Sequence, residues 1–109
     1  MIRLNKNELS RWKCYHKTNS TAYCKINGFV VYWNNSREHE FKKLELMWDL
    51  VNQGNKVICE AVENDTGLRR DLVDLTDDII YEIESTKKRA ARFKSDPKAS
   101  KIEVVGLYE

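Results

Sequence analysis

Three carboxylates on two neighbouring predicted strands are the side chains in this sequence most suited to chemistry. In the run Tyr81–Glu84, strand alternation puts Glu82 and Glu84 on one face, about 7 Å apart by strand rise. Asp71 stands near the start of the preceding strand, where a short hairpin places it across from that pair. Acidic residues are depleted in strands, and three that converge repel one another unless a cation lies between them. Hard oxygen ligands of this kind suit Mg²⁺ or Mn²⁺.

A divalent cation held by these acids could activate a water and stabilise an in-line displacement at phosphorus. The sequence leaves an alternative open, in which Glu82 and Glu84 lie on the solvated face of an edge strand and pair with Lys or Arg. Glu60 and Asp74 are further acids nearby. Alternation sets Asp74 on the face opposite Asp71, as a solvent-facing residue or a turn cap.

The length and composition define the class of protein that can carry such a site. A chain of 109 residues, 41% hydrophobic and 33% charged, is expected to form one domain rather than a low-complexity or disordered segment. No apolar run is long enough to span a membrane, and the N-terminus has no apolar secretory segment. The three cysteines are expected to be reduced, which indicates a cytoplasmic protein.

Local patterns predict two elements and a hairpin in the first half of the chain. Residues 7–17 are expected to form a helix capped by Asn7. Residues 21–26 and 29–33 flank Asn27-Gly28, which is the strongest short-range hairpin signal. A second helix is expected from a Ser36 cap to about residue 53, where Gly54 ends it.

The second half is predicted to alternate strands with one helix. Strands are expected over residues 56–62, 70–75 and 79–84, then a basic helix from a cap at Ser85 or Thr86 to about Phe93. A last strand is expected over residues 101–105. From Ser36 onward the order is helix, three strands, helix, strand, an α/β arrangement. Residues 36–109 would be the core of a single domain, and residues 1–35 an N-terminal extension.

The charges are segregated along the chain. Residues 60–84 carry nine acidic side chains and two arginines, whereas residues 87–101 carry seven basic side chains and one acid. An acidic segment followed by a basic one suits a cation site beside a polyanion. The alternative is two solvated surfaces that pair with each other.

These features resemble the PD-(D/E)XK nuclease superfamily, which includes Holliday-junction resolvases and many restriction endonucleases. The resemblance runs from about Ser36 to Val105 and consists of the element order with Glu40 near a helix start, Arg70–Asp74 on one strand and Tyr81–Glu84 on the next. Small nuclease-like proteins of archaea and their viruses are similar. The resemblance implies a restriction-endonuclease-like mixed sheet flanked by helices.

The resemblance also implies roles for single residues. Asp71 and Glu82 take the metal-binding positions, and Glu40 takes a helix carboxylate that completes the metal shell through water. Glu84 stands where the family most often has a lysine, so it would serve as a base or a further metal ligand. The missing positive charge could instead come from Lys43 or Lys87, with His39 and Arg70 as further accessory residues.

The resemblance implies a metal-dependent DNA endonuclease that uses Mg²⁺ or Mn²⁺ and acts as a homodimer, with the N-terminal hairpin as a candidate contact. The basic helix would supply salt-dependent phosphate contacts. In a viral protein the location would be the host cytoplasm. The departure at Glu84 leaves open a catalytically inactive module that binds nucleic acid or a partner on the same fold. The basic residues expected to contact DNA are Lys87, Lys88, Arg89 and Arg92.

Overall fold

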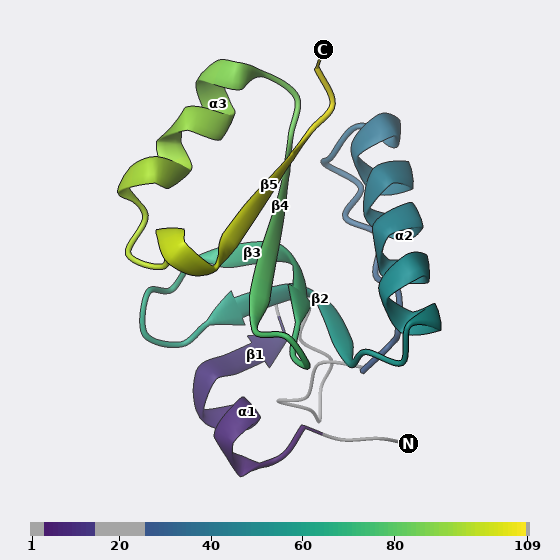
Figure 1. The fold of residues 1–109 in the computed structure, drawn as a ribbon, viewed down its shortest axis with the longest axis vertical. Helices are drawn as coiled ribbons and strands as arrows, with labels where there is room; N and C mark the ends of the chain where they lie inside the picture. The colour runs from purple at the N-terminus through teal and green to yellow at the C-terminus, as the bar shows by residue number, and fades with distance from the viewer. Residues whose placement is uncertain (1–3, 15–25, 109) are drawn as a thin grey trace.

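The structure is a computed structural model that describes residues 4–14 and 26–108. Figure 1 shows a sheet with α2 on one side and α3 on the other, while α1 lies near the N-terminal strand. The elements are α1 (Lys6–Arg11), β1 (Trp12–Cys14), α2 (Arg37–Asn52), β2 (Val57–Glu63), β3 (Arg69–Asp74), β4 (Ile79–Glu84), α3 (Lys87–Ala91), the 3₁₀ turns η1 (Arg92–Ser95) and η2 (Ala99–Lys101), and β5 (Ile102–Gly106).

The five strands form one mixed sheet in the order β1-β2-β3-β4-β5. The first three pairings are antiparallel, and β4 pairs with β5 in parallel through Ile80–Ile102 to Glu84–Gly106. The α/β class expected from the sequence is therefore confirmed, as is the order of elements from Ser36 onward. Because β4 lies between two strands and Glu82 and Glu84 are only 5% and 6% exposed, the alternative of a solvated edge strand is wrong.

The helices begin and end at residues with the expected local chemistry. The Ser36 hydroxyl accepts the His39 amide, which caps α2 as predicted, and the Thr86 hydroxyl caps α3 through the Arg89 amide. Gly54 follows α2 with φ of 88°, a left-handed conformation that glycine adopts without strain. None of the helices in the described ranges combines the length and apolar character needed to cross a membrane.

The first helix differs from its prediction. Asn5 rather than Asn7 caps α1, in a capping box with Glu8. The helix ends at Arg11 because Trp12 enters the sheet, where β1 pairs with β2 from Trp12–Glu63 to Cys14–Ala61. Helical spacing of the apolar residues could not reveal this long-range pairing. The rest of the predicted helix, residues 15–17, lies outside the described residues.

The predicted hairpin around Asn27-Gly28 is wrong in its second half. Asn27 has the positive φ of 59° that the turn signal predicted, and it exchanges hydrogen bonds with Val57. The strand expected over residues 29–33 is absent, because side chains satisfy that backbone. The Val30 amide donates to Cys59 Sγ, and the Tyr32 amide donates to Glu40. Residues 21–25, the first half of the hairpin, lie outside the described residues.

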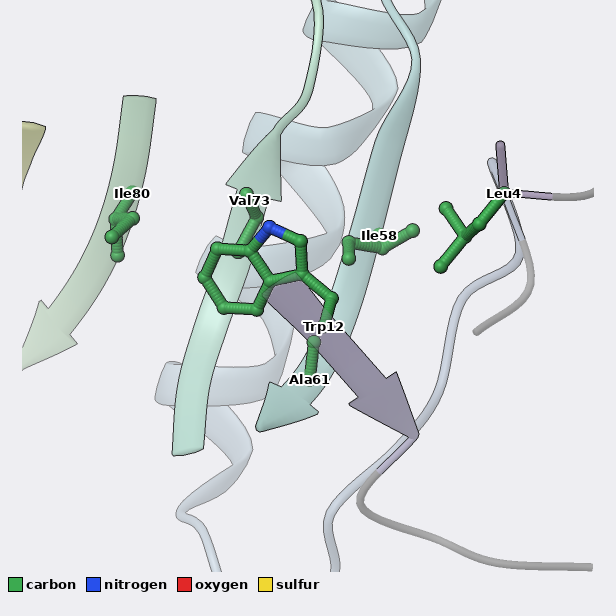
Figure 2. Close-up of a cluster of buried hydrophobic side chains, with 6 residues drawn as sticks. All are labelled: Leu4, Trp12, Ile58, Ala61, Val73 and Ile80. Carbon is green, nitrogen blue, oxygen red and sulfur yellow. The ribbon is translucent and has the colours of Figure 1, made fainter. Parts of the chain in front are cut away.

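Two apolar clusters cover the two faces of the sheet. Figure 2 shows the first, in which the Trp12 indole lies over β2 and β3 near Ile58 and Val73. Leu4, Ala61 and Ile80 complete that cluster. The second cluster joins α2 to the sheet and contains Met47, Leu50, Val57, Cys59, Leu72 and Tyr81. The face of the sheet on which another side chain lies can therefore be stated by the cluster that it adjoins.

Candidate functional site

A polar cavity of about 270 Å³ gathers most of the acids that the sequence singled out. It is bounded by residues at the start of α2, the start of β3, the end of β4, and the α3–η1 segment. Three of its side chains are carboxylates, three are arginines and one is a histidine. The lining residues are Ser36, His39, Arg69, Asp71, Glu82, Ile83, Glu84, Ser85, Arg89 and Arg92.

Asp71 and Glu82 are tied to each other's strand. The last partner pair between β3 and β4 at this end is Leu72–Tyr81. Beyond it, the Asp71 amide donates to Glu82 Oε1 at 2.8 Å, and the Ile83 amide donates to Asp71 Oδ2 at 2.8 Å. Side-chain acceptors thus replace the ladder hydrogen bonds where the pairing between β3 and β4 ends. The exchange fixes both carboxylates at the cavity.

Burial and like charge act together on Glu82. Loss of solvent and the neighbouring Asp71 charge raise the pKa of Glu82 to about 8. Arg70 Nη1 lies 3.7 Å from Glu82 Oε2 and opposes the shift only in part. Burial is the larger cause of the raised pKa, and the charge of Asp71 adds to it.

His39 has a more central place than the sequence indicated. The sequence analysis named His39 only as an accessory residue, but the imidazole is 12% exposed and its Nε2 lies 3.2 Å from Asp71 Oδ2. Burial disfavours the imidazolium, but the hydrogen bond to Asp71 and the charges of Asp71 and Glu40 outweigh it and raise the pKa of His39. His39 therefore links α2 to the acids of the sheet.

Glu84 forms two ion pairs with the segment that follows β4. Its Oε1 accepts from Arg92 Nη2 at 2.8 Å, and its Oε2 lies 3.5 Å from Arg89 Nε. Both arginines are more than half exposed, so they also reach the solvent at the cavity rim. Glu84 thus lines the same cavity as Asp71 and Glu82, with its charge directed at cations.

Glu40 and Lys43 belong to a buried ion network under α2. Lys43 is fully buried, with its Nζ 2.6 Å from Glu40 Oε2, 3.2 Å from Glu60 Oε2 and 2.9 Å from the Val30 carbonyl. Glu40 also accepts from Asn35 Nδ2 at 2.8 Å. Neither Glu40 nor Lys43 lines the cavity. The nearest link from Glu40 to it is His39 Nδ1, 3.8 Å away.

The backbone at Glu60 explains how Asp71 reaches α2. Glu60 has φ of 51°, in the left-handed region that is rare for a residue other than glycine. Cys59 packs in the cluster under α2, and Glu60, the next residue, also points to α2 through Lys43. On β3, Leu72 packs in that cluster and the adjacent Asp71 contacts His39 of α2. Alternation is therefore interrupted on both strands at one level of the sheet.

Arg70 holds the other side of the site. Its guanidinium makes two hydrogen bonds to Asp96, at 2.8 and 3.0 Å, and one to Glu63 at 3.1 Å. Burial works against its charged form, but these acids and Glu82 raise the pKa of Arg70 further. Arg70 therefore links β2, β3 and β4 to the turn after η1 and stays charged.

The remaining predicted residues lie outside the cavity. Lys87 lines a separate groove beside β5, with its Nζ 6.0 Å from the Tyr108 ring centre, and Lys88 is exposed on α3. Asp74 is fully buried, so the expectation of a solvent-facing side chain is wrong. It caps the turn after β3 by accepting the Thr76 and Asp77 amides, which is the other expected role.

A divalent cation at the cavity would need several oxygen ligands close together. In the parts of the chain that the structure describes, no three acidic, histidine or cysteine side chains lie together as a metal-holding group. Asp71 and Glu82 present carboxylate oxygens from adjacent strands at the cavity. Carboxylate oxygens are the ligands that hard divalent cations prefer.

Sequence reasoning missed the buried network and the central place of His39. The spacing of Glu40 and Lys43 was a usable signal, because residues three apart share one helix face. Glu60 gave no such signal, because its role depends on a backbone conformation that its residue type disfavours.

Compared with models of known protein families, with curated proteins and with solved structures, the chain matches none.

Proposed function

We propose that this protein is a metal-dependent DNA endonuclease of restriction-endonuclease-like fold that hydrolyses phosphodiester bonds at the Asp71–Glu82 cavity. The observation that supports it is the pair of carboxylates, Asp71 and Glu82, held at one cavity by hydrogen bonds to each other's strand, beside arginines at the rim. Acids in the cavity suit a divalent cation, and exposed arginines suit the phosphates of a polyanion. DNA is the partner, and a homodimer presents two cavities to two strands.

Asp71 and Glu82 would hold the Mg²⁺ or Mn²⁺ ion. When bound, the ion would supply charge for the phosphate and make a water more acidic. Arg89 and Arg92 would orient the phosphate at the rim. His39 would hold a proton on Nε2 next to Asp71, since its pKa is raised. Glu40 and Lys43 would position His39 from behind, without touching the substrate.

The test is a cleavage assay on supercoiled, linear, single-stranded and branched DNA with Mg²⁺, Mn²⁺ or EDTA. Cleavage that EDTA abolishes is expected. Asp71→Asn and Glu82→Gln should each abolish it while the fold persists, since Asp71→Asn removes a charge from a crowded site and Glu82→Gln puts a neutral side chain of the same length where burial raises the pKa of Glu82. Glu38→Gln is the matched control, because Glu38 is exposed on α2 and outside the cavity.

Thermal unfolding gives a second readout of the same site. Mg²⁺ or Mn²⁺ should raise the melting temperature of the wild type by mass action, and should raise that of Asp71→Asn and Glu82→Gln less. Equal shifts in all variants would place the ion elsewhere. No shift together with no cleavage would overturn the proposal.

The second candidate is a nucleic-acid-binding module without catalysis. The specific observation in its favour is the pairing of Glu84 with Arg92 and Arg89, because the position of the family lysine then contributes no positive charge to the cavity. Salt-sensitive DNA binding without cleavage would select this candidate. Neither binding nor cleavage would overturn both.

A further inference from the structure

The outer side of α2 carries an apolar stripe that no described element covers. Phe41, Leu44 and Trp48 follow one another at helical spacing and are 59%, 39% and 63% exposed. We call these three residues the α2 stripe. Figure 1 shows that α2 contacts the sheet on one side only, and its buried residues Met47 and Leu50 belong to that inner side. These large apolar side chains gather on one side of the helix, where another surface could cover them.

We propose that the α2 stripe is the contact through which two copies of this chain form a two-fold dimer with their α2 helices antiparallel. The proposal does not depend on the nuclease activity, because it concerns a surface outside the cavity. Two features support it: a hollow that an aromatic ring can fill, and a charge pattern that complements its own reverse.

The stripe contains its own receptor. Phe41, Leu44 and Trp48, with Glu45 and Asp49, line a hollow of about 280 Å³. In an antiparallel pair, Phe41 of one copy lies at the level of Trp48 of the other. Each copy then places an aromatic ring against the hollow of its partner. A two-fold contact requires this property, because the same patch must act as both ligand and receptor.

The charges beside the stripe favour the antiparallel direction. Lys42 lies in the N-terminal half of α2, and the exposed Glu45 and Asp49 lie further along. With Phe41 level with Trp48 of the second copy, Lys42 lies between Glu45 and Asp49 of that copy, about 3 Å along the axis from each. A parallel pair would set each charge against its own equivalent. Opposite charges attract and like charges repel across helices, so the reverse direction is favoured.

The exposed area of the stripe is too small to form the whole dimer contact, so the charged residues beside it must also be part of that contact. The two aromatic rings expose roughly 200–300 Å², from the total area of such side chains and their exposed fractions. A stable dimer buries about 800 Å² on each partner. The stripe can therefore be the centre of the contact and not the whole of it. The same arrangement sets His39 of the two copies about 16 Å apart along the axis, so both cavities belong to one assembly.

The first experiment measures oligomeric state by sedimentation equilibrium without DNA, over a wide concentration range. The wild type is expected to dimerise, and Leu44→Lys is expected to raise the dissociation constant at least about tenfold. Leu68→Lys is the matched control, because Leu68 is 43% exposed and lies outside the stripe. Circular dichroism verifies that each variant is folded. A monomeric wild type, or a dimer that Leu44→Lys leaves intact, would overturn the proposal.

The second experiment tests direction by exchanging charges. Lys42→Glu alone, and the double variant Glu45→Lys/Asp49→Lys alone, should each weaken the dimer, while an equal mixture of the two should recover it. In a parallel pair Lys42→Glu would leave the repulsion unchanged. If Lys42→Glu alone and Glu45→Lys/Asp49→Lys alone each dimerise as the wild type does, the antiparallel arrangement is wrong. DNA cleavage does not enter either measurement, so failure of the nuclease proposal is distinguishable from failure of this one.

Discussion

Glu60 and Asp71 lie opposite one another between the partner pairs Cys59–Leu72 and Ala61–Arg70, and both point to α2. Glu60 contacts Lys43, and Asp71 contacts His39, four residues away from Lys43 on the same helix. The left-handed backbone at Glu60 therefore coincides with two ion contacts between sheet and helix. The left-handed backbone at Glu60 therefore bears on both the ion network under α2 and the cavity at the first turn of α2.

The buried Lys43 is predicted to be a main source of stability. Lys43→Met should lower the free energy of unfolding by about 3–5 kcal/mol, because Glu40 and Glu60 lose the buried cation that they share, and Arg69 Nε, 3.5 Å from Glu60 Oε1, offsets this loss only in part. The double variant Lys43→Met/Glu60→Gln should recover part of the loss, since burial already raises the pKa of Glu60 and its neutral form is less costly. Denaturant titration measures both.

The adjacent lysine provides the control. Lys42 pairs with the exposed Glu45 at 2.9 Å, so Lys42→Met should change the free energy of unfolding by no more than about 0.5 kcal/mol. This comparison is made at a concentration at which sedimentation shows each variant to be a monomer. Equal losses in Lys42→Met and Lys43→Met would contradict the network.

The raised pKa of Glu82 predicts that the protein loses stability with rising pH. The native state binds a proton more tightly than the unfolded state, whose Glu titrates near 4.5, so the stabilising effect is full below that pH. It is lost as pH rises toward about 8. The raised pKa of His39 adds a loss of the same sign, beginning above 6.5.

Glu82→Gln isolates the carboxyl contribution. This variant should be more stable than the wild type at pH 8. Its melting temperature should fall less between pH 5 and 8, because the contribution of Glu82 to the loss of stability is absent. Melting temperatures across this range, without divalent ions, measure it. A wild type whose stability rises over the whole interval would show that Asp71 and Glu82 do not share a crowded site.

How far the sequence predicted this structure depended on how local each cause was. The strand Ile79–Glu84 and the Ser36 cap follow from nearest-neighbour patterns and were predicted correctly. Trp12 was assigned to a helix because its pairing partner Glu63 is distant in the chain. Residues 29–33 have strand composition, but Cys59 and Glu40 take their amides instead. Composition cannot reveal which side chain will do so.

The candidate site divides in the same way. The positions of Asp71 and Glu82 at neighbouring strand ends followed from hairpin geometry. The hydrogen bond of His39 to Asp71 did not, since it requires the interruption of alternation at Glu60. The exposure of the α2 stripe also depends on which face of the helix the sheet covers, and helical spacing alone treats every apolar stripe as core.

Glu84 is predicted to stabilise the fold by offsetting the positive charge of the arginines in the α3–η1 segment. Glu84→Lys would place a third cation beside Arg89 and Arg92, and should lower the free energy of unfolding by about 1 kcal/mol, because the arginines are largely exposed and screened. Glu84→Lys/Arg92→Glu should restore most of the loss by reversing the pair. If Glu84→Lys matches the wild type in stability, these ion pairs contribute nothing measurable.

The salt dependence of DNA binding should separate exposed lysines from paired arginines. Each phosphate contact that is removed should lower the steepness of log K against log salt concentration by about 0.9 on a duplex. Lys88→Ala should therefore reduce the slope by nearly that amount, whereas Arg92→Ala should reduce it less, because Glu84 already offsets part of the Arg92 charge. Glu84→Gln should act in the opposite sense and steepen the slope, since it frees Arg92 and Arg89 for phosphate. Fluorescence anisotropy with a labelled duplex at several salt concentrations measures these slopes, with Lys6→Ala, on the exposed side of α1, as the matched control. A slope that Glu84→Gln leaves unchanged would exclude the α3–η1 arginines from the DNA contact.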